Sequence, residues 1–372
     1  MSSVLHAIEI VIGVAVVLAV FYDLFEGVVL PRPAVGRLRL APYVIRKLWP
    51  PWRWIATRGE RVDRQEDRLA IFGPLALILL LTVWAVTLVL GYGLILDGLR
   101  DQLHPPSTNF GTSIYTSATT LLPLSYGDVI PIGVAARLAI IAESATGLAL
   151  IALVITLLFS LYASFQRREE LVVTLDALAG APPSGIQLLE TTAKLDLKHD
   201  LKQTFDEWRG WSAAVLESHL AYPILIYFRS SHDNEAWLNS FGAVMDAATL
   251  LVSCMEEDGA KGPAHLMLKV GGHLVEDFSW YFRLPRSDEP YVERSEFEQA
   301  LERLGRAGYR CKNPGDAWEV FVRFRSRYAA PLSQLAHNMA IPPAQWISDR
   351  SYLPHRQRPL REPRRPGRLR RH

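Results

Sequence analysis

Three long apolar runs, at residues 5–30, 69–96 and 138–165, constrain the fold more than any other feature of this sequence. A bilayer core of about 30 Å is crossed by roughly 20 helical residues. The middle run contains no charged residue, and the third contains one, Glu143. One such run could be a buried helix of a soluble protein, but three of this length indicate membrane spans. We therefore expect an all-α membrane protein with three transmembrane helices.

Basic residues in the connections predict the orientation. The connection 31–68 carries ten Arg or Lys against four acids, and such loops remain in the cytoplasm. The connection 97–130 holds one basic residue, Arg100, and is expected outside. The N-terminus is then outside and the C-terminal half inside. Three tryptophans among the cytoplasmic arginines suggest a segment along the inner headgroups, or an ordinary loop. They are Trp49, Trp52 and Trp54.

Composition and motifs exclude several functional classes. A net charge of +2 is too small for a nucleic-acid-binding protein. Two cysteines, Cys254 and Cys311, are too few for a disulfide framework. No basic segment precedes the first apolar run, so we expect no cleaved signal peptide. No nucleophile with a partnered base and no metal-ligand spacing is found, so we expect no enzyme, no catalytic residue, no cofactor and no bound metal other than a permeating ion.

Residues 107–131, between the second and third runs, predict a re-entrant loop. Ser107 is a plausible N-cap for a short helix that runs to about Thr120 and is too short to span. Non-helical backbone must then return to the outside, and lipid tolerates this only where the backbone is buried in protein or lines water. A selectivity filter, in which backbone carbonyls replace the hydration shell of an ion, has this construction.

Tyr115 through Pro131 resembles, without a gap, the pore segment of the two-transmembrane ion-channel domain family. Tyr126, Gly127 and Asp128 fall on the Tyr-Gly-Asp of that family. Gly147 falls on its inner-helix hinge. The resemblance covers about residues 69–166, and parts of the flanking sequence resemble a bacterial subgroup with an additional N-terminal span and a helical cytoplasmic tail.

The resemblance implies roles for individual residues. The carbonyls of residues 123–127 would coordinate potassium, Asp128 would hold the outer end of the filter, and Thr119 and Thr120 would belong to the pore helix. One pore loop per chain implies a homotetramer, here in a bacterial inner membrane, with lipid and monovalent cations as partners and no nucleic acid.

The filter departs from the Thr-Val-Gly-Tyr-Gly of the family, because this chain has Pro123, Leu124, Ser125, Tyr126 and Gly127. Losing the threonine removes the hydroxyl that forms the innermost ion site, and proline restricts the backbone. A serine in left-handed geometry would cost on the order of 1–2 kcal/mol. A poorly selective cation channel, or a non-conducting membrane sensor, is therefore an alternative to a potassium channel.

Two residues of the third run are candidates for gating or for lining the cavity. Glu143 either faces the cavity and concentrates cations, or braces the pore helix through Thr119 or Thr120. Gly147 either permits the inner helix to bend or allows close helix packing. Small residues nearby form a face that would also allow close packing. They are Ser144, Ala145 and Ala149.

The expected domains are an N-terminal span with its basic connector (1–68), a pore domain (69–166), a helical cytoplasmic domain (167–350) and a disordered arginine-rich tail (351–372). In the cytoplasmic domain, apolar residues at helical spacing predict helices over 186–211, 236–255 and 266–282. The basic connector and the tail could both contact anionic lipid. Four histidines in this half lack metal-binding spacing and are expected to be ordinary surface or core residues. They are His219, His232, His265 and His273.

Overall fold

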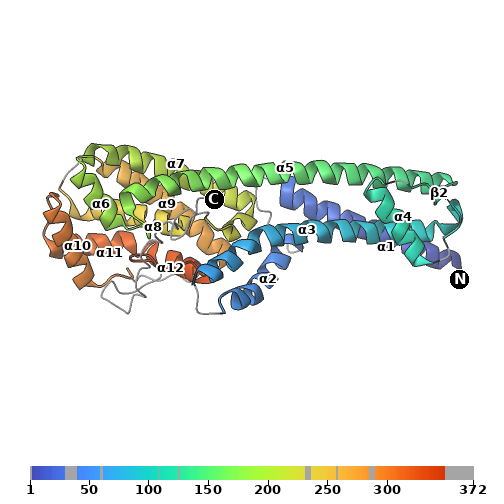
Figure 1. Ribbon diagram of the computed structural model, residues 1–372, viewed down its shortest axis with the longest axis horizontal. Helices are drawn as coiled ribbons and strands as arrows, with labels where there is room; N and C mark the ends of the chain where they lie inside the picture. Colours follow the sequence, from blue (N-terminus) through green and yellow to red (C-terminus); the bar gives the residue numbers. More distant parts are fainter. Residues whose placement is uncertain are drawn as a thin grey trace, which may run out of the picture. The chain divides into compact units, whose positions relative to one another are not determined.

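The computed structural model describes residues 2–29, 40–58, 62–107, 109–124, 126–230, 236–256, 259–284 and 290–347 (Figure 1). Ser125, residues 31–39, His232 and the tail 351–372 therefore lie outside the described residues. The chain forms two compact units. The first comprises Met1–Arg168 and Ala214–Arg229, and the second comprises Glu169–Ala213 and Ser230–His372. The segment 214–229 thus belongs with the pore domain, although it follows the second unit's first helices in the sequence.

The first unit is all-helical apart from one short strand pair. Its elements are α1 (Ser2–Leu24), η1 (Phe25–Val29), α2 (Leu40–Ala56), α3 (Val62–Gly98), η2 (Arg100–Gln102), β1 (Leu103–His104), α4 (Phe110–Leu121), β2 (Ile130–Pro131), the first part of α5 (Val134–Ala179), the last part of α7 (Leu201–Ala221) and η4 (Pro223–Tyr227). The three expected spans correspond to α1, α3 and α5, which are long and apolar enough to cross a membrane. The expected all-α membrane fold is confirmed.

Glycines let α1 and α3 run antiparallel in close contact (Figure 1). A Cβ at Gly13 would lie 2.5 Å from the carbonyl oxygen of Gly91, so only glycine permits this approach. Asp23 is buried here and accepts a hydrogen bond of 2.7 Å from Trp84 Nε1. Because small residues allow backbones to approach and dispersion contacts to form, this packing is stable within lipid. The additional N-terminal helix is thus part of the pore unit.

The basic connector contains the amphipathic helix α2. Trp49 is buried against Phe72 of α3 and Tyr227, at ring-centroid distances of 4.9 and 5.2 Å. Trp54 is 57% exposed. The tryptophans therefore do not share one environment, because the face with Trp49 packs on protein and the face with Trp54 is open.

The second unit is a bundle of helices around α8. Its elements are the end of α5, α6 (Gly185–Lys194), η3 (Lys198–Asp200), the first part of α7 (Leu201–Ala221), α8 (Trp237–Cys254), α9 (Lys261–Phe282), α10 (Arg294–Arg306), α11 (Pro314–Arg325) and α12 (Ala329–Asn338). η4 (Pro223–Tyr227) belongs to the first unit. The single helix expected over 186–211 is wrong, because the chain leaves helical geometry between α6 and α7, where Asp196 has a φ of 58°. The helices expected over 236–255 and 266–282 are confirmed as α8 and α9.

Helix α8 is also long and apolar enough to cross a membrane. However, 94% of it is buried inside the second unit, where Asp246 is paired with the buried Arg325 and accepts a 2.7 Å hydrogen bond from Tyr328. Apolar residues on every side of a helix are expected where the helix is surrounded by protein. We therefore describe α8 as the core helix of this unit.

Candidate functional site: the pore segment

The re-entrant segment begins with helix α4, which contains 12 residues and is too short to span a bilayer. Its N-cap is Asn109, whose side chain accepts a 3.0 Å hydrogen bond from the backbone N–H of Thr112. The expected cap at Ser107 is wrong. Its hydroxyl instead donates to the carbonyl of Asn109. Thr119 and Thr120 lie in the last turn of the helix, as expected.

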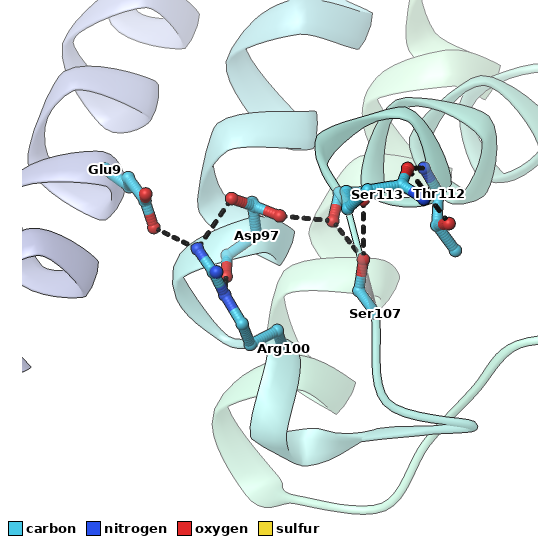
Figure 2. A network of polar contacts seen from close by, with 7 residues as sticks. Glu9, Asp97, Arg100, Ser107, Thr112 and Ser113 are labelled. Atoms are coloured by element: carbon cyan, nitrogen blue, oxygen red, sulfur yellow. Dashed lines mark hydrogen bonds and ion pairs between the residues drawn. The ribbon is translucent and has the colours of Figure 1, made fainter. Parts of the chain in front are cut away.

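A polar network holds the first turn of α4 to the start of α1 and the end of α3 (Figure 2). The Ser113 hydroxyl donates to Asp97 Oδ1 at 2.9 Å and lies 2.9 Å from the hydroxyl of Ser107. Arg100 bridges Asp97 Oδ2 at 2.7 Å and Glu9 Oε2 at 2.8 Å. The pore helix is thereby connected, through two ion pairs, to a helix that the minimal two-helix pore unit does not contain.

The segment between α4 and β2 contains the expected filter residues. Leu124 and Tyr126 are 50% and 67% exposed, and a Cβ at Gly127 would meet no described atom within 4 Å. Pro123 has a φ of +20° and Gly127 a φ of +78°, so the backbone is irregular on both sides of Ser125. A single chain leaves these residues largely uncovered.

Two contacts fix the outer end of this segment. The Asp128 carboxylate is a hydrogen-bond partner of the Tyr115 hydroxyl, which projects from α4. Ile130 and Pro131 then pair antiparallel with His104 and Leu103. Pro131 therefore lies in β2, and the inner helix begins three residues later at Val134. The strand pairing thus fixes the path of the backbone from this segment into α5.

Helix α5 packs against α4 through Glu143. This side chain is fully buried, and its Oε1 is in short contact with the Ser117 hydroxyl, which also lies 3.0 Å from the carbonyl oxygen of Val89. Of the two alternatives for Glu143, the structure shows the brace, with Ser117 as the partner in place of Thr119 or Thr120. Ser117 was not expected as a site residue.

Gly147 lies one turn further along α5. A Cβ at this position would overlap the carbonyl oxygen of Leu121, the last residue of α4. The close packing that was one of two alternatives for Gly147 is therefore present. Nearby, the hydroxyls of Tyr92 and Thr146 lie 2.9 Å apart and connect α3 with α5.

The end of the inner helix that lies beyond the apolar run is held by the segment 214–229. Buried Arg168 donates to the carbonyl oxygens of Leu225 at 3.0 Å and Phe228 at 2.7 Å. The ring of His219 lies against the same guanidinium, at 3.5 Å from Nη1. Burial, reinforced by the charge of Arg168, lowers the pKa of His219 to about 3, so this ring is neutral at physiological pH.

Several of these residues were missed at the sequence level. Arg100 could have been singled out, because it is the one Arg or Lys in the outward connection and follows Asp97 by one helical turn. No feature of the sequence around Ser117 indicated that this residue contacts Glu143. Among the described residues, no group of three or more His, Cys, Asp or Glu is placed to hold a metal ion.

Comparison with known proteins agrees with this geometry. Residues 76–164 match the family described as "Ion channel", and this segment includes most of α3, all of α4, the filter segment and the apolar part of α5. This match supports an ion-channel domain over residues 76–164, and ion channels are not a class of enzymes. No solved structure matches the chain.

One curated protein is similar over a longer stretch. It is the uncharacterized membrane protein YdjJ of Bacillus subtilis (strain 168), which is 22% identical over 219 residues. The match covers 58% of this chain and 63% of that relative's length. It supports membrane location and leaves ion selectivity open.

Proposed function

We propose that this protein is a subunit of a tetrameric channel that conducts monovalent cations, preferentially potassium, down their electrochemical gradient. The proposal is based on the exposure of Leu124 and Tyr126, on either side of Ser125. Irregular backbone at membrane depth has to be covered by protein or to line water. A closed ring of four chains would cover this backbone with protein on one side and let it line a water-filled path on the other.

The proposal assigns roles to the filter residues. The carbonyls of residues 123–127 coordinate the ion, and Asp128, tied to Tyr115, holds the outer end. No cofactor is needed, because conduction requires only that carbonyl dipoles replace the hydration shell of the ion. The channel lies in a bacterial inner membrane with its N-terminus outside, and the open face of α2 and the basic tail contact anionic lipid.

A poorly selective cation channel is the second candidate. The observation that favours it is Pro123 itself, whose ring restricts the backbone at the start of the expected filter. Proline also lacks the hydroxyl that threonine provides at the innermost ion site. A filter with one altered site would coordinate potassium less uniformly.

Ion flux through the purified protein in liposomes tests both candidates. We expect barium-sensitive flux with a reversal potential that follows the potassium gradient. A reversal potential that responds equally to sodium and potassium would establish the poorly selective channel. A silent parent that conducts after Pro123→Thr and Ser125→Gly are combined would reject conduction as the native function and support a sensor.

Matched variants distinguish the pore from leakage through damaged liposomes. Gly127→Ala places a side chain where φ is +78°, and we expect it to reduce flux at least tenfold. Gly27→Ala is the control, because a Cβ there also meets no described atom within 4 Å. Gly27 lies in η1, outside the proposed filter. Equal flux from both variants would contradict a pore at residues 123–127.

A further inference from the structure

An open cavity of about 600 Å³ lies in the second unit, between α9 and the junction of α11 with α12. Residues on one face of α9 line it on one side, including His265, Lys269 and His273. Phe324 and Arg327 line it on the other. Its size falls in the range of pockets that hold small molecules, about 300–1,000 Å³.

Gly272 keeps this cavity open. It lies in the interior of α9, where glycine costs about 1 kcal/mol relative to alanine, yet a Cβ there would meet no described atom within 4 Å. The preceding Gly271 differs, because its Cβ would overlap the sulfur of Met245. Packing therefore explains Gly271 and does not explain Gly272. A side chain at 272 would enter the cavity that it lines.

The charged groups around the cavity favour an anion. Lys269 and Arg327 carry positive charge, against the single acid Glu276. Within the described part of the chain, neither Lys269 nor Arg327 forms an ion pair with a carboxylate. His265 and His273 add ring nitrogens that can donate hydrogen bonds. Unpaired basic groups around a cavity attract phosphate or carboxylate, and the arginine fork matches either group.

The apolar part of the lining favours an anionic ligand that also carries a planar ring. Phe324 is half-buried, and its ring contacts the edge of His265 at a centroid distance of 5.8 Å. The Arg327 guanidinium lies 5.7 Å from the same ring. Leu268 and Tyr328 form a buried floor. Aromatic and guanidinium faces at this spacing stack on planar rings.

We propose that this cavity is a binding site for a small phosphorylated ring compound of mononucleotide size. Its phosphate is held by Lys269 and Arg327, and its ring lies against Phe324 and passes over Gly272. The site belongs entirely to the second unit, so the proposal does not depend on conduction by the pore.

Calorimetric titration of the purified full-length protein with the four ribonucleoside 5′-monophosphates tests the site. We expect at least one of them to bind, and the corresponding nucleoside and inorganic phosphate each to bind at least tenfold more weakly. Equal binding of inorganic phosphate would overturn the role of the ring. Absence of binding by all four nucleotides would overturn the proposal.

Two pairs of variants locate the binding. Gly272→Leu fills the cavity and Arg327→Glu reverses its charge, and we expect each to weaken binding at least tenfold. The controls are Gly210→Leu on α7, where a Cβ also meets no described atom within 4 Å, and Arg323→Glu, one turn from Arg327 and outside the lining. Thermal unfolding checks that all four variants fold. Unchanged binding in folded Gly272→Leu would place the ligand elsewhere and reject the site.

Discussion

For Gly147, a role as a hinge and a role in packing predict different effects of substitution on stability and flux. Its missing side chain lets α5 lie against the carbonyl oxygen of Leu121, and this carbonyl is backbone that cannot turn away. We expect Gly147→Ala to lower the free energy of unfolding by about 1–3 kcal/mol, because overpacking destabilises a core. We also expect it to reduce ion flux. Thermal unfolding in detergent measures the first effect. A variant of unchanged stability and reduced flux would show a hinge without a packing requirement.

Glu143 is the second residue of the same contact, and its substitutions separate shape from charge. Glu143→Gln keeps the size of the side chain and can donate an N–H to Ser117 Oγ, which leaves the serine hydroxyl free to donate to Val89. Glu143→Ala leaves a cavity and removes one of the two hydrogen-bond partners of the Ser117 hydroxyl, and losses of this kind cost about 1–3 kcal/mol. We therefore expect flux and thermal stability near the parent level for the glutamine variant, and a clear loss of stability for alanine.

The same pair of variants tests the alternative role of Glu143. If the carboxylate concentrated cations in the cavity, Glu143→Gln would reduce single-channel conductance at low ionic strength while stability remained unchanged. The full burial of the side chain argues for the brace. Conductance recorded at low and high salt distinguishes the two roles, since surface-charge effects on ion entry are screened by salt.

At the scale of elements, helix α5 is held beyond its apolar run by a segment that returns from far along the chain. Arg168 is bound by the carbonyls of Leu225 and Phe228, and neutral His219 lies beside it. In the unfolded chain this histidine has its ordinary pKa of about 6.5, and in the folded chain its pKa is about 3. Below pH 6.5 the unfolded state therefore binds a proton that the folded state does not.

The free energy of unfolding should consequently fall as pH decreases from 6.5 toward 3, by about 1 kcal/mol for each pH unit from this group. Thermal unfolding between pH 7 and pH 5 measures the slope. We expect His219→Gln to flatten it, whereas His199→Gln, at an exposed ring, should leave it unchanged. Identical slopes in the parent and His219→Gln would contradict the assignment of a neutral buried ring.

The sequence predicted the long spans well, and it predicted the helix breaks and caps less well. The length of the apolar runs predicted α1, α3 and α5, because the thickness of a bilayer sets that length. The break between α6 and α7 was missed, since residues 195–197 include no glycine or proline and the turn depends on a left-handed Asp196. Ser107 and Asn109 are both good caps, so the choice between them required the network around Asp97.

Within the candidate site, the sequence offers a motif for the expected filter and offers less for the contacts that support it. Tyr126, Gly127 and Asp128 are adjacent and can be recognised as a motif. The contact between Ser117 and Glu143 depends on how α4 is rotated against α5, and periodicity does not fix that rotation. The membership of 214–229 in the first unit likewise depends on tertiary contacts of Arg168 and Tyr227.

At the scale of the whole molecule, the proposed tetramer would cover residues that one chain leaves exposed, Leu124 and Tyr126. If four chains form one pore and one defective chain stops conduction, flux depends on the fourth power of the fraction of intact chains. We expect equal co-expression of parent and Gly127→Ala chains to leave about one-sixteenth of the parent flux. Flux near one-quarter would indicate a dimeric pore, and flux near one-half would indicate chains that act independently. Co-expression with Gly27→Ala should leave the flux unchanged, which makes the loss specific to the filter.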